Sequence, residues 1–319
     1  MGLFKSLFGG KTDNSSEGKT ERQLQNEFET LKYDGIRAHR LRRMDYARKC
    51  LEEAVKLKDD YETYGYLAQV LVEMGELEAA IEPLKHMAQA EPTIALNFIS
   101  LANVYFMLED YRQMEENAQL AIDAEPQNAQ AYYLKGKAAH ALNKDGEALT
   151  LLTQAVSLQE DYAEALLLRG EVYLRQGQLA EALQDADGVI ASERETESGW
   201  LLRGAVHEVM EQAGEAEADY QQVLEQDPFN QQAYMSLGKL YGEQKRYADA
   251  ISLMDDAIEM SPVFAEAYAL RAEMKELTGD AEGAAKDAAS AANLQAAGEV
   301  KTEVIDPAAS IKEIDILHL

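Results

Sequence analysis

The chain of 319 residues carries 58 acidic against 30 basic side chains, which gives a formal net charge of −28. Because phosphate binding requires clustered Lys and Arg, this acidic excess disfavours a nucleic-acid partner. The single cysteine, Cys50, excludes an internal disulfide, and no run of about 18 apolar residues predicts a membrane span, so we expect a cytoplasmic location.

The first 27 residues are predicted to be a flexible N-terminal segment with a short apolar start. Residues 1–8 place Leu3, Phe4, Leu7 and Phe8 on one side of a short helix, and a polar stretch rich in Gly and Ser follows at 9–24. Two interpretations stay open for the apolar start. It is a weak anchor to a membrane surface or a partner, or a frayed terminus that packs loosely or not at all.

Residues 28–60 are predicted to form a first, more divergent helical unit with a concentration of basic side chains. Within residues 37–49 the only acid is Asp45, and the basic residues are Arg37, His39, Arg40, Arg42, Arg43, Arg48 and Lys49. In so acidic a chain this asymmetry has two interpretations. The basic residues pair with acidic neighbours in a solvated end unit, or they contact an acidic lipid surface or an acidic partner.

A period of 34 residues organises the chain from residue 61 onwards. The consecutive windows are 61–94, 95–128, 129–162, 163–196, 197–230, 231–264 and 265–298. Position 8 of the window is always Gly or Ala, position 20 is Ala in six of the seven, and position 4 is aromatic in six of the seven. Such a period is typical of repeat proteins, in which each unit packs only on its neighbours. Each window is predicted to form two antiparallel helices joined by a short turn near positions 14–17.

The window 231–264 carries the pattern most completely. It contains Tyr234, Leu237, Gly238, Tyr241, Ala250, Ala257 and Pro262 at characteristic spacings. This order resembles the tetratricopeptide repeat, a helix–turn–helix unit of 34 residues. The resemblance extends over residues 28–298 and implies an all-α, right-handed α-α superhelix (solenoid) of about eight repeats.

Two windows depart locally from the pattern. Pro83 falls inside the second helix of its window, where we expect a mild kink because proline removes a backbone donor. The window 197–230 has Glu211 where a Gly or polar turn residue is usual, and Gly214 follows three places later. We therefore expect a displaced turn between its two helices.

Residues 299–319 lie outside the period and are predicted to be a C-terminal capping helix or tail. Asp306 and Pro307 make a good helix start, and Val304, Ala308 and Ile311 share an apolar stripe. A solenoid needs an element that covers its last core face, which is one interpretation of this segment. The alternative is a strip that docks in a groove, its own or that of a neighbour.

No motif in the sequence predicts catalysis. The sequence from His207 through Glu208 to Glu211 resembles the start of a zinc-protease helix, but it lacks the second histidine, and His207 stands where other windows have a packing Tyr. The five histidines are spread over distant segments, and no metal cluster can be built around Cys50. We therefore predict no enzymatic activity, no cofactor and no metal.

The resemblance implies that the first helix of each repeat lines a concave surface, with positions 2, 5, 9 and 12 pointing into it. Position 5 is a large apolar residue in five consecutive windows, and an exposed apolar surface of this kind usually marks a binding site. The groove residues implied in this way are Ile99, Asn103, Phe106, Tyr133, Lys137, His140, Leu167, Glu171, Leu174, Leu201, Met235 and Lys239.

The predicted function is therefore a non-catalytic protein–protein interaction scaffold that binds a peptide or helix in the concave groove. One sub-family of these repeats clamps the C-terminal carboxylate of chaperone peptides with Lys at position 5, whereas position 5 here carries no Lys, which argues against that ligand. The alternative function is a peripheral membrane-surface adaptor that uses the apolar N-terminus and the basic first unit. A further alternative is a groove that is closed by superhelical curvature or filled by the C-terminal tail.

Overall fold

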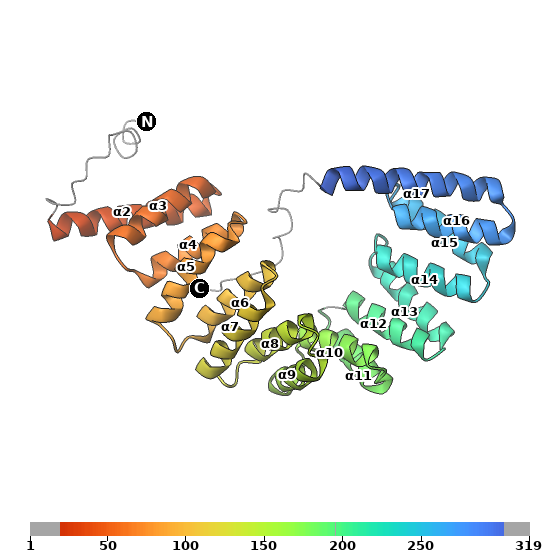
Figure 1. Cartoon of the computed structure of the whole chain (residues 1–319), viewed down its shortest axis with the longest axis horizontal. Helices are drawn as coiled ribbons and strands as arrows, with labels where there is room; N and C mark the ends of the chain where they lie inside the picture. The colour runs from red at the N-terminus through yellow and green to blue at the C-terminus, as the bar shows by residue number, and fades with distance from the viewer. Residues whose placement is uncertain (1–19, 195, 303–319) are drawn as a thin grey trace. The chain divides into compact units, whose positions relative to one another are not determined.

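The computed structural model describes residues 20–194 and 196–302, which contain sixteen α-helices and no strand (Figure 1). The chain forms two compact units, and the described parts of them are residues 20–92, the N-terminal unit, and residues 93–302, the C-terminal unit. The N-terminal unit contains α2 (Glu21–Arg40), α3 (Met44–Leu57), α4 (Tyr61–Glu73) and α5 (Leu77–Ala90).

The C-terminal unit contains the other twelve helices. They are α6 (Ala95–Met107), α7 (Tyr111–Ala124), α8 (Ala129–Ala141), α9 (Asp145–Leu158), α10 (Ala163–Arg175), α11 (Leu179–Ala191), α12 (Thr196–Val209), α13 (Ala213–Gln226), α14 (Gln231–Glu243), α15 (Tyr247–Met260), α16 (Ala265–Thr278) and α17 (Ala281–Thr302). From α5 onwards, every second helix of a pair begins 34 residues after the previous one. The predicted period is therefore the period of the structure.

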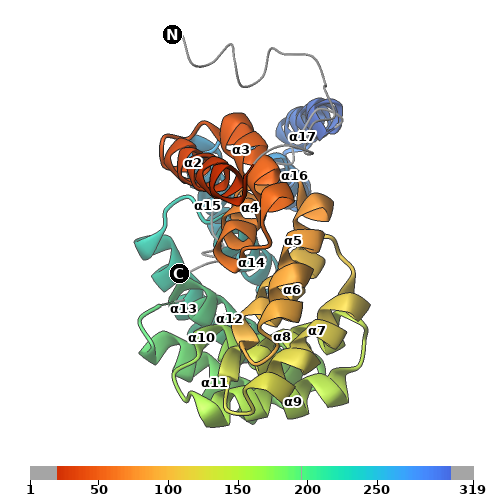
Figure 2. The ribbon, with the colours of Figure 1, turned by 90° about the vertical axis from the view of Figure 1, so that its left-hand side faces the viewer.

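Consecutive helices form antiparallel pairs that lie side by side in both views (Figure 1, Figure 2). In the C-terminal unit the first helices of successive pairs, α6, α8, α10, α12, α14 and α16, also contact one another and form one layer. We call this the first-helix layer. The prediction of an all-α solenoid built from two-helix repeats is confirmed.

The close approach inside a pair explains why position 8 is small. Gly204 on α12 faces Tyr220 on α13, and an added Cβ at Gly204 would lie 2.6 Å from a carbon of the tyrosine ring. The Tyr220 side chain is almost fully buried there, so the ring has no room to retreat. The size of the side chain at position 8 thus sets how closely two helices pack.

Left-handed backbone geometry ends the first helix at position 15. In the window 197–230 this residue is Glu211, with φ of 59°, and Gln212 N–H donates to the His207 carbonyl at 2.8 Å to close the turn. Gly75, at the same position of another window, has φ of 76°. The turn at Glu211 is therefore in register with the others, and the prediction that it is displaced was wrong. The closing hydrogen bond holds the turn even without glycine.

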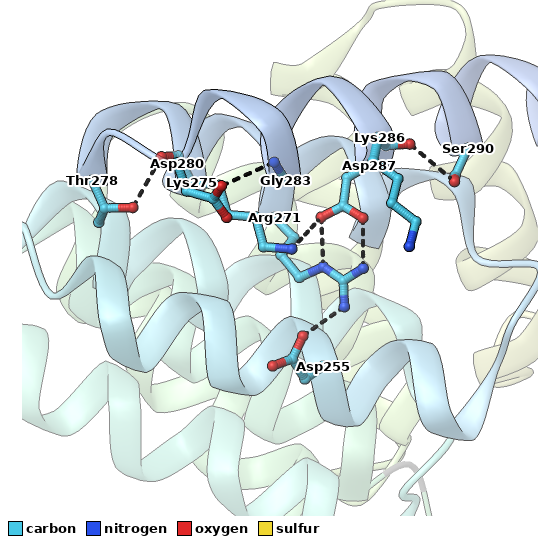
Figure 3. A network of polar contacts seen from close by, with 9 residues as sticks. All are labelled: Asp255, Arg271, Lys275, Thr278, Asp280, Gly283, Lys286, Asp287 and Ser290. Atoms are coloured by element: carbon cyan, nitrogen blue, oxygen red, sulfur yellow. Dashed lines mark hydrogen bonds and ion pairs between the residues drawn. The ribbon is translucent and has the colours of Figure 1, made fainter.

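Salt bridges between positions 7 and 23 connect the two helices of three pairs. In the last pair, Arg271 on α16 donates to both carboxylate oxygens of Asp287 on α17, at 2.6 and 2.8 Å, and to Asp255 on α15 (Figure 3). Lys275 adds a third hydrogen bond to Asp287 at 2.8 Å. Burial opposes ionisation of Asp287, but these cationic donors hold its pKa below the usual value.

The N-terminal boundary differs from the expected one. Helix α2 begins at Glu21, because Thr20 caps it by accepting from Gln23 N–H while the Gln23 side chain accepts from Thr20 N–H. Residues 21–27 are therefore helical, although the sequence analysis expected a flexible segment. A capping box between polar residues was the signal that could have found this start.

At the other end α17 extends to Thr302, beyond the last 34-residue window. Pro83 lies buried inside α5, which has the same length of 14 residues as α7. The expected apolar start at residues 1–8 and the expected helix start at Asp306 lie outside the described residues.

Candidate functional site

The structure places all twelve predicted groove residues on first helices of the C-terminal unit. Helix α6 carries Ile99, Asn103 and Phe106; α8 carries Tyr133, Lys137 and His140; α10 carries Leu167, Glu171 and Leu174; α12 carries Leu201; and α14 carries Met235 and Lys239. Their exposure differs from residue to residue. Ile99 is only 2% exposed and belongs to the core, whereas Tyr133, Leu167 and Leu201 are half-buried.

Four of the predicted residues surround one hollow of about 270 Å³ in the first-helix layer. The hollow is lined by Leu167, Glu171, Leu174, Ser198, Leu201, Leu202, Ala205 and Gln232, from α10, α12 and α14. The apolar side chains provide a surface for an apolar group, and the hydroxyl, amide and carboxylate provide hydrogen-bonding groups beside it. We call this the α10–α14 hollow.

The sequence analysis missed three lining residues that the structure adds. Ser198 and Gln232 occupy position 2 of their windows, and Ala205 occupies position 9. These positions were among those implied to face the groove, but only large apolar or charged side chains were selected from them. Small and polar side chains at the same positions were the available signal.

A second cluster surrounds Lys137 on α8. The Lys137 Nζ lies 3.7 Å from the centroid of the Phe106 ring and 5.8 Å from that of Tyr133, and the Tyr133 and Tyr162 rings are 5.2 Å apart. A cation over an aromatic face is attracted by the electron density of the ring. Burial lowers the pKa of Lys137, whereas the charge of Glu164 acts in the opposite direction. We call Phe106, Tyr133 and Lys137 the lysine–aromatic cluster.

The lysine is followed along α8 by His140, which belongs to a polar contact with α9 and α10. The Arg175 guanidinium donates to the Asp145 carboxylate at 2.6 Å and to His140 Nδ1 at 2.7 Å. These groups also influence Glu171 at the hollow, where burial raises the pKa of the carboxyl while the charges of His140 and Arg175 lower it. Glu171 is reached by water, yet the surrounding protein weakens its hydration, as expected on a concave surface.

Three predicted residues contribute to neither the hollow nor the lysine–aromatic cluster. Asn103 is half-buried on α6, and Met235 on α14 packs against the core around Tyr234 and Leu237. Lys239 is exposed on the same helix. The structure therefore divides the predicted groove into two separate sets of contacts rather than one continuous stripe.

Within residues 20–194 and 196–302, no group of three or more His, Cys, Asp or Glu side chains could hold a metal ion. In the same residues, no helix has the length and apolar character needed to cross a bilayer.

Sequence profiles and solved structures relate the chain to known proteins. A profile described as "Tetratricopeptide repeat" matches residues 99–156, 201–262 and 237–298, and one described as "TPR repeat" matches residues 136–177. Together these ranges span more than half of the chain. A comparison with curated proteins gave no significant match.

Three solved structures illustrate the likeness in fold. PilF of Pseudomonas aeruginosa is 17% identical, with 66% of this chain and 97% of that chain covered at a TM-score of 0.55. PilW, described as a type IV pilus biogenesis factor, is 21% identical, with 67% and 96% covered at 0.54. The Cut9–Hcn1 hetero-tetramer of the APC/C is 14% identical, with 94% and 57% covered at 0.55.

At these identities the solved structures show a common fold and nothing about the ligand. The profile matches, the 34-residue period and the stacked antiparallel helix pairs agree with one another. The chain belongs to the tetratricopeptide repeat family.

Proposed function

We propose that the chain is a non-catalytic protein-interaction scaffold that binds a peptide segment, extended or helical, along the first-helix layer of the C-terminal unit. The observation that carries this proposal is the α10–α14 hollow, where Leu167, Leu174 and Leu201 from two helices converge beside polar groups. Apolar anchors next to hydrogen-bonding groups are what a bound peptide requires.

The size of the hollow favours a peptide over a free small molecule. Sites for drug-sized ligands usually measure about 300–1,000 Å³ and enclose most of the ligand. The hollow, at about 270 Å³, is smaller and open, so it suits one or two side chains of a longer ligand that continues along the layer. Ser198, Gln232 and Glu171 are placed to hydrogen-bond the backbone of such a ligand.

Charged substitutions in the hollow test the proposal. We expect Leu167→Glu combined with Leu201→Glu to abolish capture of the partner, because two carboxylates would occupy the apolar anchor site and lose hydration when a ligand covers them. The measurement is affinity capture followed by mass spectrometry, with circular dichroism to verify the helical content of the variant.

The matched control is Leu120→Glu combined with Leu277→Glu, which adds the same charge at two exposed leucines away from the hollow. Partners that the wild type and the control capture, and that the hollow variant does not, support the proposal. If the hollow variant is folded and captures the same proteins as the wild type, the hollow is not the binding site.

The turn between α2 and α3 favours a second candidate, an adaptor at an anionic membrane surface. Leu41 is 61% exposed at the tip of this turn, and the exposed Arg40 and Arg43 beside it form no salt bridge with any of the described residues. By contrast, the other basic side chains of this region include Arg42, which pairs with Glu73 at 2.7 Å. An apolar tip between unpaired arginines suits acidic lipid head groups.

Sedimentation with vesicles tests this candidate. We expect the wild type to sediment with vesicles rich in phosphatidylserine, and Leu41→Glu combined with Arg43→Glu to remain in the supernatant, because each basic residue near such a surface contributes about 1 kcal/mol. Neutral phosphatidylcholine vesicles are the control. A wild type that does not sediment with the acidic vesicles excludes this function.

A further inference from the structure

We infer that Lys137 is the receptor for an acidic side chain of the bound peptide, next to the apolar residue that enters the α10–α14 hollow. This inference rests on the proposed function and names the chemistry of its ligand. It is carried by the surroundings of the Lys137 ammonium group.

The ammonium group of Lys137 is half-buried and has no carboxylate partner among the described residues. It contacts the faces of Phe106 and Tyr133, and the nearest acid to influence it, Glu164, forms no salt bridge with it. Aromatic faces attract a cation, but they do not replace the hydrogen bonds that the ammonium loses on leaving water.

Other covered cations of this protein hold carboxylates. Lys32 pairs with Asp60 at 2.9 Å, and Arg169 pairs with Asp185 at 2.6 Å. The chain has 58 acidic side chains to choose from, so a covered cation without one is an exception that needs a reason. A site that is completed by a carboxylate of the ligand provides that reason.

The position of Lys137 relates the acid to the apolar anchor. Lys137 lies on α8, and the hollow begins at Leu167 on α10, the next first helix, which contacts α8. Packed helices are about 8–10 Å apart, and an extended peptide advances about 3.3 Å per residue. The acidic residue and the apolar anchor are therefore about three residues apart in an extended ligand.

The surrounding charges limit where an acid is accepted. Glu164 and Glu171 lie on α10 near the two sites, and the whole chain carries a net charge of −28. An acidic residue placed elsewhere along the ligand meets repulsion, so the preference is confined to the position opposite Lys137.

Selection from a random peptide library tests the inference on the full chain. Wild-type protein, Lys137→Met and Lys137→Glu are each used to enrich binding peptides, and Lys286→Met on α17 is the matched control that removes an exposed lysine charge. Amidated and free-acid forms of the enriched peptides are then titrated against each protein.

We expect wild-type and control protein to enrich peptides with Asp or Glu about three residues from an apolar side chain. Lys137→Met should bind these peptides about 10–100-fold more weakly, the usual effect of losing a hydrogen bond to a charged group. Lys137→Glu should enrich Lys or Arg at that position, and amidation of the C-terminus should change affinity little.

Three results overturn the inference, and they differ from failure of the proposed function. They are peptides without an acidic preference, an acidic preference that persists in Lys137→Met, and binding that is lost on amidation, which would identify a terminal carboxylate instead. If the wild type enriches no peptide beyond the Leu167→Glu, Leu201→Glu variant, the proposed function itself fails.

Discussion

At position 15 of each repeat one residue adopts left-handed backbone geometry, yet glycine occupies this position only in some repeats. The residues with positive φ at this position are Arg42, Gly75, Glu109, Asn143, Gly177, Glu211, Lys245 and Gly279. A side chain there costs about 1–2 kcal/mol because Cβ crowds the following carbonyl oxygen. Each non-glycine turn thus contains strain that the rest of the repeat tolerates.

Replacing Glu211 should therefore stabilise the protein. We expect Glu211→Gly to raise the free energy of unfolding by about 0.5–1 kcal/mol, because relief of the strain exceeds the entropy that glycine adds to the unfolded chain. Ala218→Gly, in the middle of α13, should lower it by about 1 kcal/mol, since glycine is unfavourable inside a helix. Urea unfolding measures both changes, and equal signs would contradict the explanation of the turn.

Residue identity alone did not predict these turns or the site. Glu211 is an ordinary helix former, so the sequence suggested a displaced turn, whereas the closing hydrogen bond from Gln212 depends on the geometry of the whole pair. Ile99 has the same position and character as Leu167, but packing buries the first and leaves the second at the hollow. Side-chain type was predictable, and exposure was not.

At the scale of the helix pair, positions 7 and 23 hold either an ion pair or two apolar residues. Arg169 on α10 forms two hydrogen bonds with Asp185 on α11, at 2.6 and 2.8 Å, and Asp185 is 2% exposed. The pair α14 and α15 has Leu237 and Leu253 at these positions, within one apolar cluster. Two solutions to the same packing problem therefore exist in one chain.

This comparison predicts how the ion pair contributes to stability. Asp185→Leu alone should lower the free energy of unfolding by about 3–5 kcal/mol, because it leaves a covered guanidinium without its carboxylate. Adding Arg169→Leu should restore most of that loss, since the double variant reproduces the apolar arrangement at Leu237 and Leu253. Thermal and urea unfolding measure both, and a double variant no better than the single one would refute this view.

The helices themselves were predictable for a reason that belongs to this scale. The 34-residue period encodes which residues face the partner helix, and Gly204 opposite Tyr220 shows how directly the size of a side chain determines the contact. The hollow needs three successive first helices to be placed relative to one another. That arrangement depends on packing between repeats, which the pattern within one repeat does not contain.

At the scale of the whole molecule the dominant property is the net charge of −28. Most carboxylates have no cation available, because 58 acids face 30 bases. Repulsion among them opposes the compact state, and dissolved salt screens it. Exposed salt bridges, which salt also weakens, contribute little individually.

We therefore expect salt to stabilise this protein. Raising the ionic strength from about 0.01 M to about 0.15 M shortens the screening length from about 30 Å to about 8 Å. If the relief of repulsion amounts to about 1 kcal/mol, the midpoint of thermal unfolding rises by about 2–4 °C. Differential scanning calorimetry in sodium chloride at neutral pH measures this. A midpoint that falls would mean that the salt bridges outweigh the repulsion.

The arginine at position 7 has a consequence for the length of the array. Arg203 on α12 bonds Asp219 in its own pair and Asp187 on α11 of the preceding pair, at 2.8 Å each. Arg169 makes the corresponding contact to Thr153 at 3.4 Å. Excision of residues 163–196 as one block would bring Thr153 opposite Arg203 and reproduce a junction that already exists. A 34-residue module can thus be removed or duplicated without inventing a new junction, whereas a cut at any other length separates the arginine from its partner.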